Sequence, residues 1–310
     1  MTIELARAEF QRDPVWGPMS HPARDTIEDG RPPWKDHIYL AFWDAAAEVY
    51  GFFHWNNSPN HDTGKAQLSV WIKGEALDIK ERLAPSTTHF SSEHFSYDMR
   101  SQIEVKGERL HGRLVAAPRF SPADYTPGEI LPPLVPGKPL QHWQQGLTLA
   151  GDLVLDGTNV SIDALGFRTR TWGFRDDSQQ FQEYISLFIC LESSDITVMK
   201  FRWPDGSLRT DGVVVSEDSA VAVADMHVTR NSAGQPIRLE LDLADGRTLT
   251  HSSSVVARPA CGARLVSLSV KARPSVLGTR SSTGNSTVSE DSVSSNKRSS
   301  ATSTESEFRR

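Results

Sequence analysis

The fold is decided by the stretch LTLAGDLVLDGTNVSIDAL, residues 147–165. Its leucines recur at every second position, and the chain then turns at Asp156-Gly157 into a second alternating run. Alternation on both sides of an Asp-Gly pair is the strongest short-range signal of a β-hairpin. We therefore expect two antiparallel strands joined by a tight primed turn at Asp156-Gly157.

The same pattern recurs later in the chain. IRLELDLADG, residues 237–246, alternates apolar and charged side chains and ends in Asp245-Gly246. A third pair, Asp205-Gly206, follows the strand-like MKFRW. Helix signals are nearly absent. Regularly spaced strands joined by tight turns predict an all-β protein built of antiparallel barrels or sandwiches.

One strand-like segment, EYISLFICLE at residues 183–192, is apolar on both faces. A strand of a single barrel would show one polar side, unless a second barrel covers it. We therefore expect two lipocalin-like β domains in tandem, residues 1–140 and 141–274. They divide after a proline-rich stretch that reads as an inter-domain crossing.

The end of the chain has a different composition. Residues 275–310 are rich in Ser and Thr and have no periodic apolar face, so we predict a disordered tail. The second barrel is then either incomplete or closed by ARLVSLSVKA, residues 263–272, which alternates passably.

Composition excludes several classes of function. A net charge of −6 argues against a nucleic-acid partner. No apolar run approaches the ~20 residues of a membrane helix, and MTIELARAEF lacks the apolar core of a signal peptide. With two cysteines, Cys190 and Cys261, the chain fits a reducing cytoplasm.

Motifs for the common cofactors are missing from the sequence. It contains no Rossmann glycine pattern, no P-loop, no G-x-S-x-G and no H-E-x-x-H. His89 and His94 have an odd spacing, so they do not share one face of a strand. We therefore predict neither a cofactor nor a metal site.

A charged cluster, DALGFRTRTWGFRDD, occupies residues 163–177. Because strand side chains alternate, Arg168, Arg170 and Trp172 share one face. Arginine stacks on indole rings and binds carboxylates with a planar fork, and Asp176 at the strand end is a candidate partner. The favoured interpretation is a structural lattice that joins the two barrels. The alternative is a polar patch at the mouth of an apolar pocket.

Two motifs carry a resemblance to a known family. HWQQ (142–145), followed by a hairpin and GFRTRTWGFR (166–175), resembles a pattern of the tandem lipocalin-like family. That family is related to carotenoid 1,2-hydratases of the CrtC/AttH type and to fungal decalin-forming Diels–Alderases, and the match is best to uncharacterised bacterial members. Their pattern has Asp-His where this chain has Thr169-Arg170. Arg168 and Trp172 match it, so we expect these two to matter more to stability than Arg170.

The resemblance implies a hydrophobic small molecule, terpenoid, steroid or polyene-like, in an apolar barrel pocket. It allows a cofactor-free hydratase, isomerase or cyclase, a non-catalytic carrier or sensor, or a decayed paralogue. Candidate proton donors are Asp176 and His142. Candidate ligand-binding residues are the polar or aromatic Arg168, Trp172, Arg175 and Gln144 and the pocket aromatics Trp43, Phe53 and Trp55.

Overall fold

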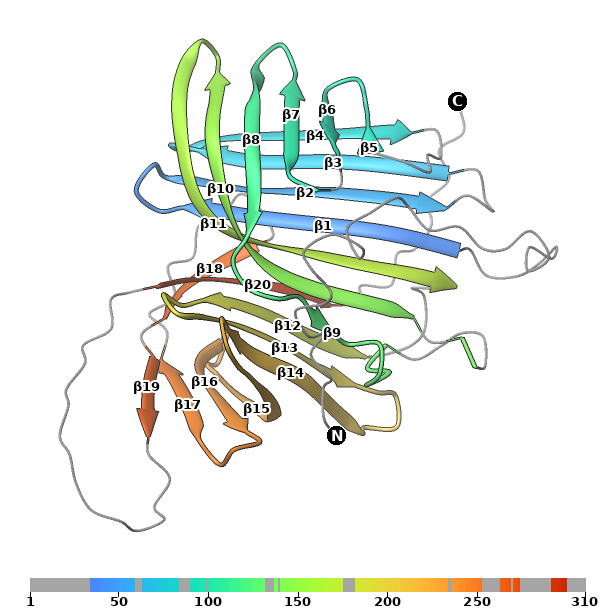
Figure 1. Ribbon diagram of the computed structural model, residues 1–310, viewed down its shortest axis with the longest axis vertical. Helices are drawn as coiled ribbons and strands as arrows, with labels where there is room; N and C mark the ends of the chain where they lie inside the picture. Colours follow the sequence, from blue (N-terminus) through green and yellow to red (C-terminus); the bar gives the residue numbers. More distant parts are fainter. Residues whose placement is uncertain are drawn as a thin grey trace.

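The computed structural model describes residues 34–58, 63–83, 90–98, 100–131, 137–138, 140–174, 182–233, 236–252, 263–268, 270–273 and 291–299. Within these ranges every regular element is a β-strand, and the strands form two antiparallel sheets (Figure 1). The predicted all-β class is therefore confirmed. No helix in the described ranges is long and apolar enough to cross a membrane.

Sheet 1 contains the first eleven described strands. They are β1 (Trp34–Asp44), β2 (Val49–Ser58), β3 (Thr63–Ile72), β4 (Glu75–Leu83), β5 (Phe90–Ser91), β6 (Phe95–Tyr97), β7 (Gln102–Lys106), β8 (Leu110–Pro118), β9 (Ala123–Asp124), β10 (Gln141–Leu155) and β11 (Thr158–Phe174). Their order is β4-β3-β2-β1-β11-β10-β8-β7-β6-β5, and β9 pairs with β10.

Sheet 1 curls so that β1–β4 and β5–β8 cross each other, with the β10–β11 hairpin joining the two layers (Figure 1). Alternate side chains from both layers form the larger apolar core. Phe53 and Trp55 on β2 stack at 5.3 Å between ring centroids, and Tyr97 of β6 stacks on Trp55 at 5.2 Å. The interior of this half-barrel is therefore filled by aromatic side chains.

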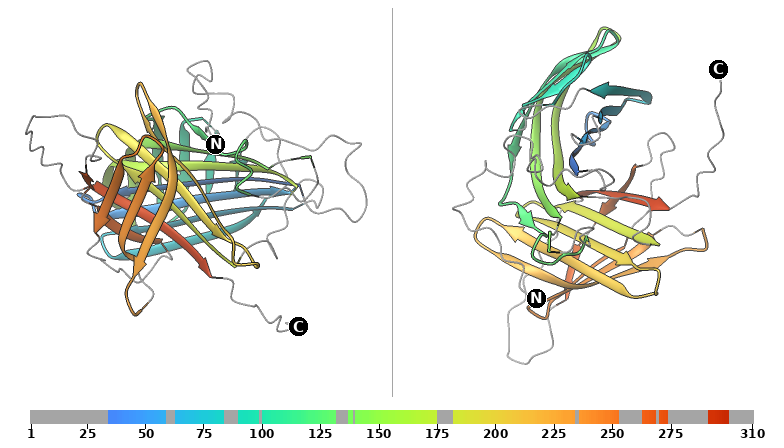
Figure 2. Two further views of the ribbon diagram at one scale, coloured as in Figure 1. Left: turned by 90° about the horizontal axis from the view of Figure 1, so that it is seen from below. Right: turned by 90° about the vertical axis from the view of Figure 1, so that its right-hand side faces the viewer.

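Sheet 2 contains the remaining nine described strands. They are β12 (Glu183–Cys190), β13 (Ser194–Arg202), β14 (Leu208–Ser216), β15 (Ala220–Arg230), β16 (Pro236–Leu243), β17 (Thr248–Ser252), β18 (Ala263–Leu268), β19 (Val270–Arg273) and β20 (Asp291–Ser299). Their order is β18-β20-β12-β13-β14-β15-β16-β17-β19. A curled sheet 1 lies above this second sheet in the right-hand view of Figure 2.

The C-terminal strands complete sheet 2. The stretch predicted to close the second barrel supplies β18 and β19, which stand at opposite ends of the strand order. These two strands are nearly consecutive in the chain, which brings the two ends of the order together. Within the tail predicted to be disordered, β20 pairs with β12 and β18, so these residues differ from that prediction. The rest of residues 275–310 lies outside the described residues.

The change of sheet does not coincide with the expected domain boundary. β10 and β11 belong to sheet 1 because β11 pairs along its length with β1. The chain enters sheet 2 only at β12, whereas the sequence placed the second domain from residue 141. The division into two domains at residue 140 stays a prediction, and that residue does not separate the sheets.

Each of the three Asp-Gly pairs lies at a hairpin tip, as predicted. Only the first forms a turn with two positive φ angles, 47° at Asp156 and 81° at Gly157. In the other two tips only Gly206 and Gly246 have positive φ, 83° and 85°. The loops there are longer, so the expectation of a primed turn is correct at one position of three.

The two sheets pack through β12, whose two apolar faces have two different neighbours. Phe188 and Cys190 join an apolar cluster with the outer face of sheet 1, where Phe188 stacks on Phe167 at 4.6 Å. Leu187 and Ile189 point into the core of sheet 2 itself. The expectation that a second β layer covers this strand is confirmed.

Candidate functional site

The β10–β11 hairpin presents polar side chains on both of its faces. One face, which we call the inner face, points into the core of sheet 1, and the other meets sheet 2. Register pairs Gln145 with Arg168 on the inner face, and pairs His142 with Thr171 on the junction face. Alternation therefore separates Arg168 and Trp172 from His142 and Gln144, although all four were candidates for one site.

A buried ion pair dominates the inner face. Arg170 donates from Nε to Asp36 Oδ1 at 3.0 Å and from Nη2 to Oδ2 at 2.7 Å. Both side chains are at most 3% exposed. The guanidinium also lies 4.7 Å from the ring centre of half-buried Trp172. The predicted shared face of Arg168, Arg170 and Trp172 is thus confirmed, but the lattice ties strands within sheet 1 and does not join the two sheets.

Arg168 is the second buried cation of the inner face and is 1% exposed. Its Nε and Nη2 donate to Gln145 Oε1, at 3.1 and 2.7 Å. Its Nη1 donates to the Tyr97 hydroxyl at 3.0 Å and to the Arg100 carbonyl at 2.9 Å. Burial raises the pKa of Tyr97, although the nearby Arg168 charge opposes the shift. Arg168 therefore has neutral partners for all three of its nitrogens.

The junction face carries a continuous layer of buried polar groups, the junction polar layer: His142, Thr171, Gln144, Thr197 and Tyr125. His142 Nδ1 lies 2.6 Å from Thr171 Oγ1, and Gln144 Nε2 lies 3.3 Å from His142 Nε2. Thr197 of β13 donates to Gln144 Oε1 and lies 2.8 Å from the Tyr125 hydroxyl. The layer thus links β11, β10 and the segment after β9 to sheet 2.

Asp195 extends the buried polar groups along β13. Its Oδ1 accepts from Arg119 Nη1 at 2.8 Å, and Arg119 also donates to the Leu191 carbonyl. Its Oδ2 presses against the α-carbon of Gly146 and has no hydrogen-bond partner among the described residues. Burial raises the pKa of Asp195 to about 7, and the Arg119 charge opposes that shift.

Asp211 on β14 is a second buried carboxyl at the junction and is 8% exposed. It shares a strand face with Val213, which belongs to the apolar cluster around Tyr125. Its Oδ2 has no hydrogen-bond partner in the described part of the chain. Burial raises the pKa of Asp211 to about 6, and the charge of Asp124 adds to the shift.

The aromatic residues proposed for one pocket lie on two faces of sheet 1. Phe53 and Trp55 point into the inner core, whereas Trp43 belongs to the cluster that meets β12. Their strand register explains the separation, because Trp43 pairs with Tyr50 and Phe53 pairs with Leu40. The structure therefore does not bring the three together. Arg175 and Asp176, the remaining candidates, lie outside the described residues.

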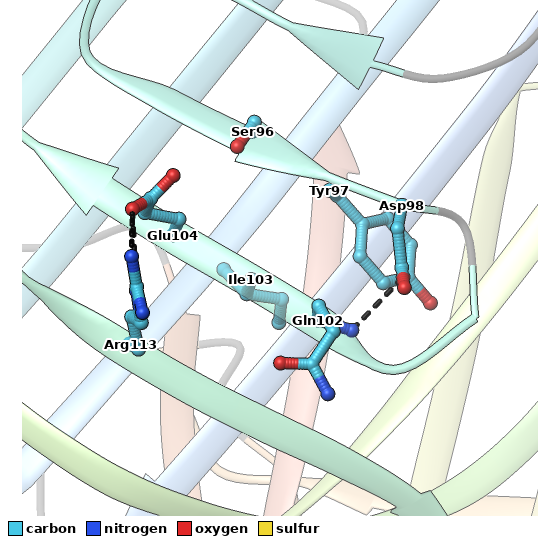
Figure 3. Close-up of a pocket in the computed structure, with 7 residues that line it drawn as sticks. All are labelled: Ser96, Tyr97, Asp98, Gln102, Ile103, Glu104 and Arg113. Carbon is cyan, nitrogen blue, oxygen red and sulfur yellow. Dashed lines mark hydrogen bonds and ion pairs between the residues drawn. The ribbon is translucent and has the colours of Figure 1, made fainter.

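A separate hollow of about 350 Å³ opens over β6, β7 and β8 (Figure 3). Asp98 Oδ1 there accepts hydrogen bonds from the backbone amides of Arg100, Ser101 and Gln102. Glu104 pairs with the exposed Arg113 at 3.0 Å. The polar groups of this hollow thus bond one another, and none of the candidate residues lines it. In the described ranges, no group of three or more His, Cys, Asp or Glu side chains could hold a metal ion.

Sequence reasoning missed several of these residues. Asp36, Asp195 and Asp211 each stand in phase with buried apolar residues of their own strand, as Asp211 does with Val213 and Val215. A carboxylate at an apolar position of an alternating strand is a usable signal of burial. Their partners come from distant strands, and no local pattern contains that information.

Comparison with solved structures supports the fold. A putative AttH from Nitrosomonas europaea has a TM-score of 0.59 at 8% identity, over 90% of this chain and 96% of its own. Kievitone hydratase from Nectria haematococca gives 0.54 at 10% identity, over 91% and 96%. CghA, solved with Sch210972, gives 0.56 at 10% identity, over 91% and 95%. The chain shares its fold with these proteins, as the predicted family relation implies.

No curated protein sequence matches the chain. One family model does match it, the domain of unknown function DUF7064, over residues 18–271. Because this match covers most of the sequence, the chain belongs to the DUF7064 family.

Proposed function

We propose that this protein binds a hydrophobic small molecule at the junction between its two sheets. The observation that carries the proposal is the junction polar layer. It lies between two apolar clusters, one around Phe188 and one around Tyr125. Small-molecule sites are mostly apolar and contain a few convergent polar groups that orient the ligand.

The ligand class follows from the composition of the junction. Aromatic and aliphatic side chains dominate it, so a terpenoid, steroid or polyene-like skeleton would gain ~25 cal/mol per Å² of apolar area removed from water. The hydroxyls and amides of the layer would orient one polar group of such a molecule. The proposed site thus moves from the inner barrel pocket to the junction, where His142 and Gln144 lie.

Turnover is the second candidate, and one observation favours it. His142 contacts the Thr171 hydroxyl at 2.6 Å and lies against the Tyr125 ring, in a position to exchange a proton with a bound molecule. Histidine changes charge near neutral pH, which suits a cofactor-free hydratase, isomerase or cyclase. Arg170 cannot take this role, because a guanidinium does not release its proton in proteins. Among its structural neighbours, one is named a hydratase.

A non-catalytic carrier or sensor would use the same site without proton transfer. In that case the layer only holds the ligand, and replacing His142 lowers affinity with no product at stake. A decayed paralogue would neither bind nor react.

The test is a panel of fatty acids, sterols and carotenoids added to the purified protein, followed by tryptophan fluorescence and product analysis. Quenching without product supports the carrier, and product without added cofactor supports the enzyme. His142→Ala should weaken either result, whereas His111→Ala, at an exposed position on β8, should not. Absence of binding at micromolar concentration for every compound would overturn the proposal.

A further inference from the structure

The polar groups of the junction differ in how fully they are bonded, and Asp211 stands out. Gly212 donates a backbone hydrogen bond to its carboxylate, while Oδ2 has no partner among the described residues. No lysine or arginine in the described ranges forms an ion pair with it. A buried carboxylate oxygen without a donor is costly, because it has lost its hydration and gained nothing in return.

The surroundings of Asp211 are apolar on one side and acidic on another. Val213, Met199 and Tyr125 belong to the apolar cluster that its strand face joins. Asp124, on β9, contributes a like charge that raises the pKa of Asp211, and Asp211 in turn raises the pKa of Tyr125, whose main cause is burial. Arg209, the cation two residues earlier on β14, is exposed and lies over Trp203. The local field is therefore negative.

The basic residues of the molecule's interior offer the opposite contrast. Arg170 is bonded to Asp36, Arg119 to Asp195, and Arg168 to Gln145 and Tyr97. None of these guanidinium groups is left to receive a ligand carboxylate without breaking a buried pair. The group with spare capacity at the junction is thus an acceptor, not a donor.

We propose that Asp211 receives the polar head of the bound molecule, and that this head is a hydrogen-bond donor, an alcohol or a protonated amine, on an apolar skeleton. This inference rests on the function proposed above and narrows it. A carboxylate head, such as that of a fatty acid, would meet the like charges of Asp211 and Asp124. A donor head would supply the missing partner of Oδ2, and an ammonium group would also offset the acidic pair.

The experiment compares three probes with the same twelve-carbon chain: dodecylamine, dodecanol and dodecanoate. Their affinities are measured at pH 7.5 by tryptophan fluorescence on the full chain. We expect dodecylamine and dodecanol to bind better than dodecanoate. In Asp211→Asn the amine should lose roughly tenfold or more in affinity, as expected for a hydrogen bond to a charged group. The alcohol should lose less if the natural head is cationic.

The matched control is Asp218→Asn, which removes the same charge from an exposed turn position. It should leave all three affinities within about twofold, which separates a local contact from general attraction of the amine to an acidic protein. Urea unfolding verifies that both variants fold. If the probes bind but Asp211→Asn changes none of them, the inference is wrong and the proposed binding function stands. If none of the probes and no compound of the larger panel binds, both are wrong.

Discussion

The two faces of the β10–β11 hairpin hold similar numbers of buried polar side chains but use them differently. On the inner face, charged groups are paired: Arg170 with Asp36, and Arg168 with Gln145 and Tyr97. On the junction face the groups are mostly neutral, and two carboxyl groups, Asp195 and Asp211, keep an oxygen without a partner. The difference suggests that the inner face stabilises the sheet, while the junction face retains capacity for a ligand.

The strongest test of the inner face is Arg170→Ala. Removing this guanidinium leaves Asp36 buried and unpaired, which should cost about 3–5 kcal/mol of unfolding free energy. Urea unfolding measures the effect, and Arg113→Ala, which breaks an exposed pair with Glu104, should cost under ~1 kcal/mol. This reverses the ranking from the family motif, in which Arg170 mattered least. Similar small losses in both variants would contradict a buried structural pair.

On the junction face, Asp211→Asn should stabilise the protein at neutral pH. The pKa of Asp211 rises from 3.8 to about 6 on folding, so the folded protein holds this proton more tightly. Its stability contribution is complete below pH 4 and is lost as the pH rises to about 6. The non-titrating variant should therefore gain up to about 3 kcal/mol over the wild type above pH 7.

The control for that measurement is the pH profile itself. The difference between wild type and Asp211→Asn should be smallest near pH 4 and constant above pH 7, and Asp218→Asn should show no such profile. A difference that does not change with pH would mean that Asp211 is not the titrating group.

How far these contrasts follow from the sequence depends on distance along the chain. Local alternation predicted the strands and all three Asp-Gly hairpin tips. The doubly apolar β12 correctly predicted a second layer. The partner of Arg170 did not follow, because Asp36 lies on β1 and reaches β11 only through long-range pairing. The same long-range register places residues 141–174 in sheet 1, and it sends Trp43 to the face opposite Phe53.

Gly146→Ala tests how closely the two sheets approach. A β-carbon at this position would overlap the Asp195 carboxylate, so the substitution forces β13 or the carboxylate to move. Overpacking of this kind typically costs about 1–3 kcal/mol. The double variant Gly146→Ala, Asp195→Ala should be less destabilised than the sum of the two single variants, since the clash is gone. Strict additivity in urea unfolding would show that the two residues do not compete for this space.

Adjacent glutamines provide the finest comparison, because Gln144 and Gln145 point to opposite faces. Gln145 accepts two hydrogen bonds from the buried Arg168, so Gln145→Ala should cost about 1.5–3 kcal/mol of unfolding free energy. Gln144 bonds the neutral Thr197 hydroxyl, so Gln144→Ala should cost only about 1 kcal/mol. Ligand affinity should show the reverse order and fall in Gln144→Ala alone. If Gln145→Ala weakened binding more than Gln144→Ala did, in variants that remain folded, the ligand would belong to the inner face and the assignment of the two faces would have to be exchanged.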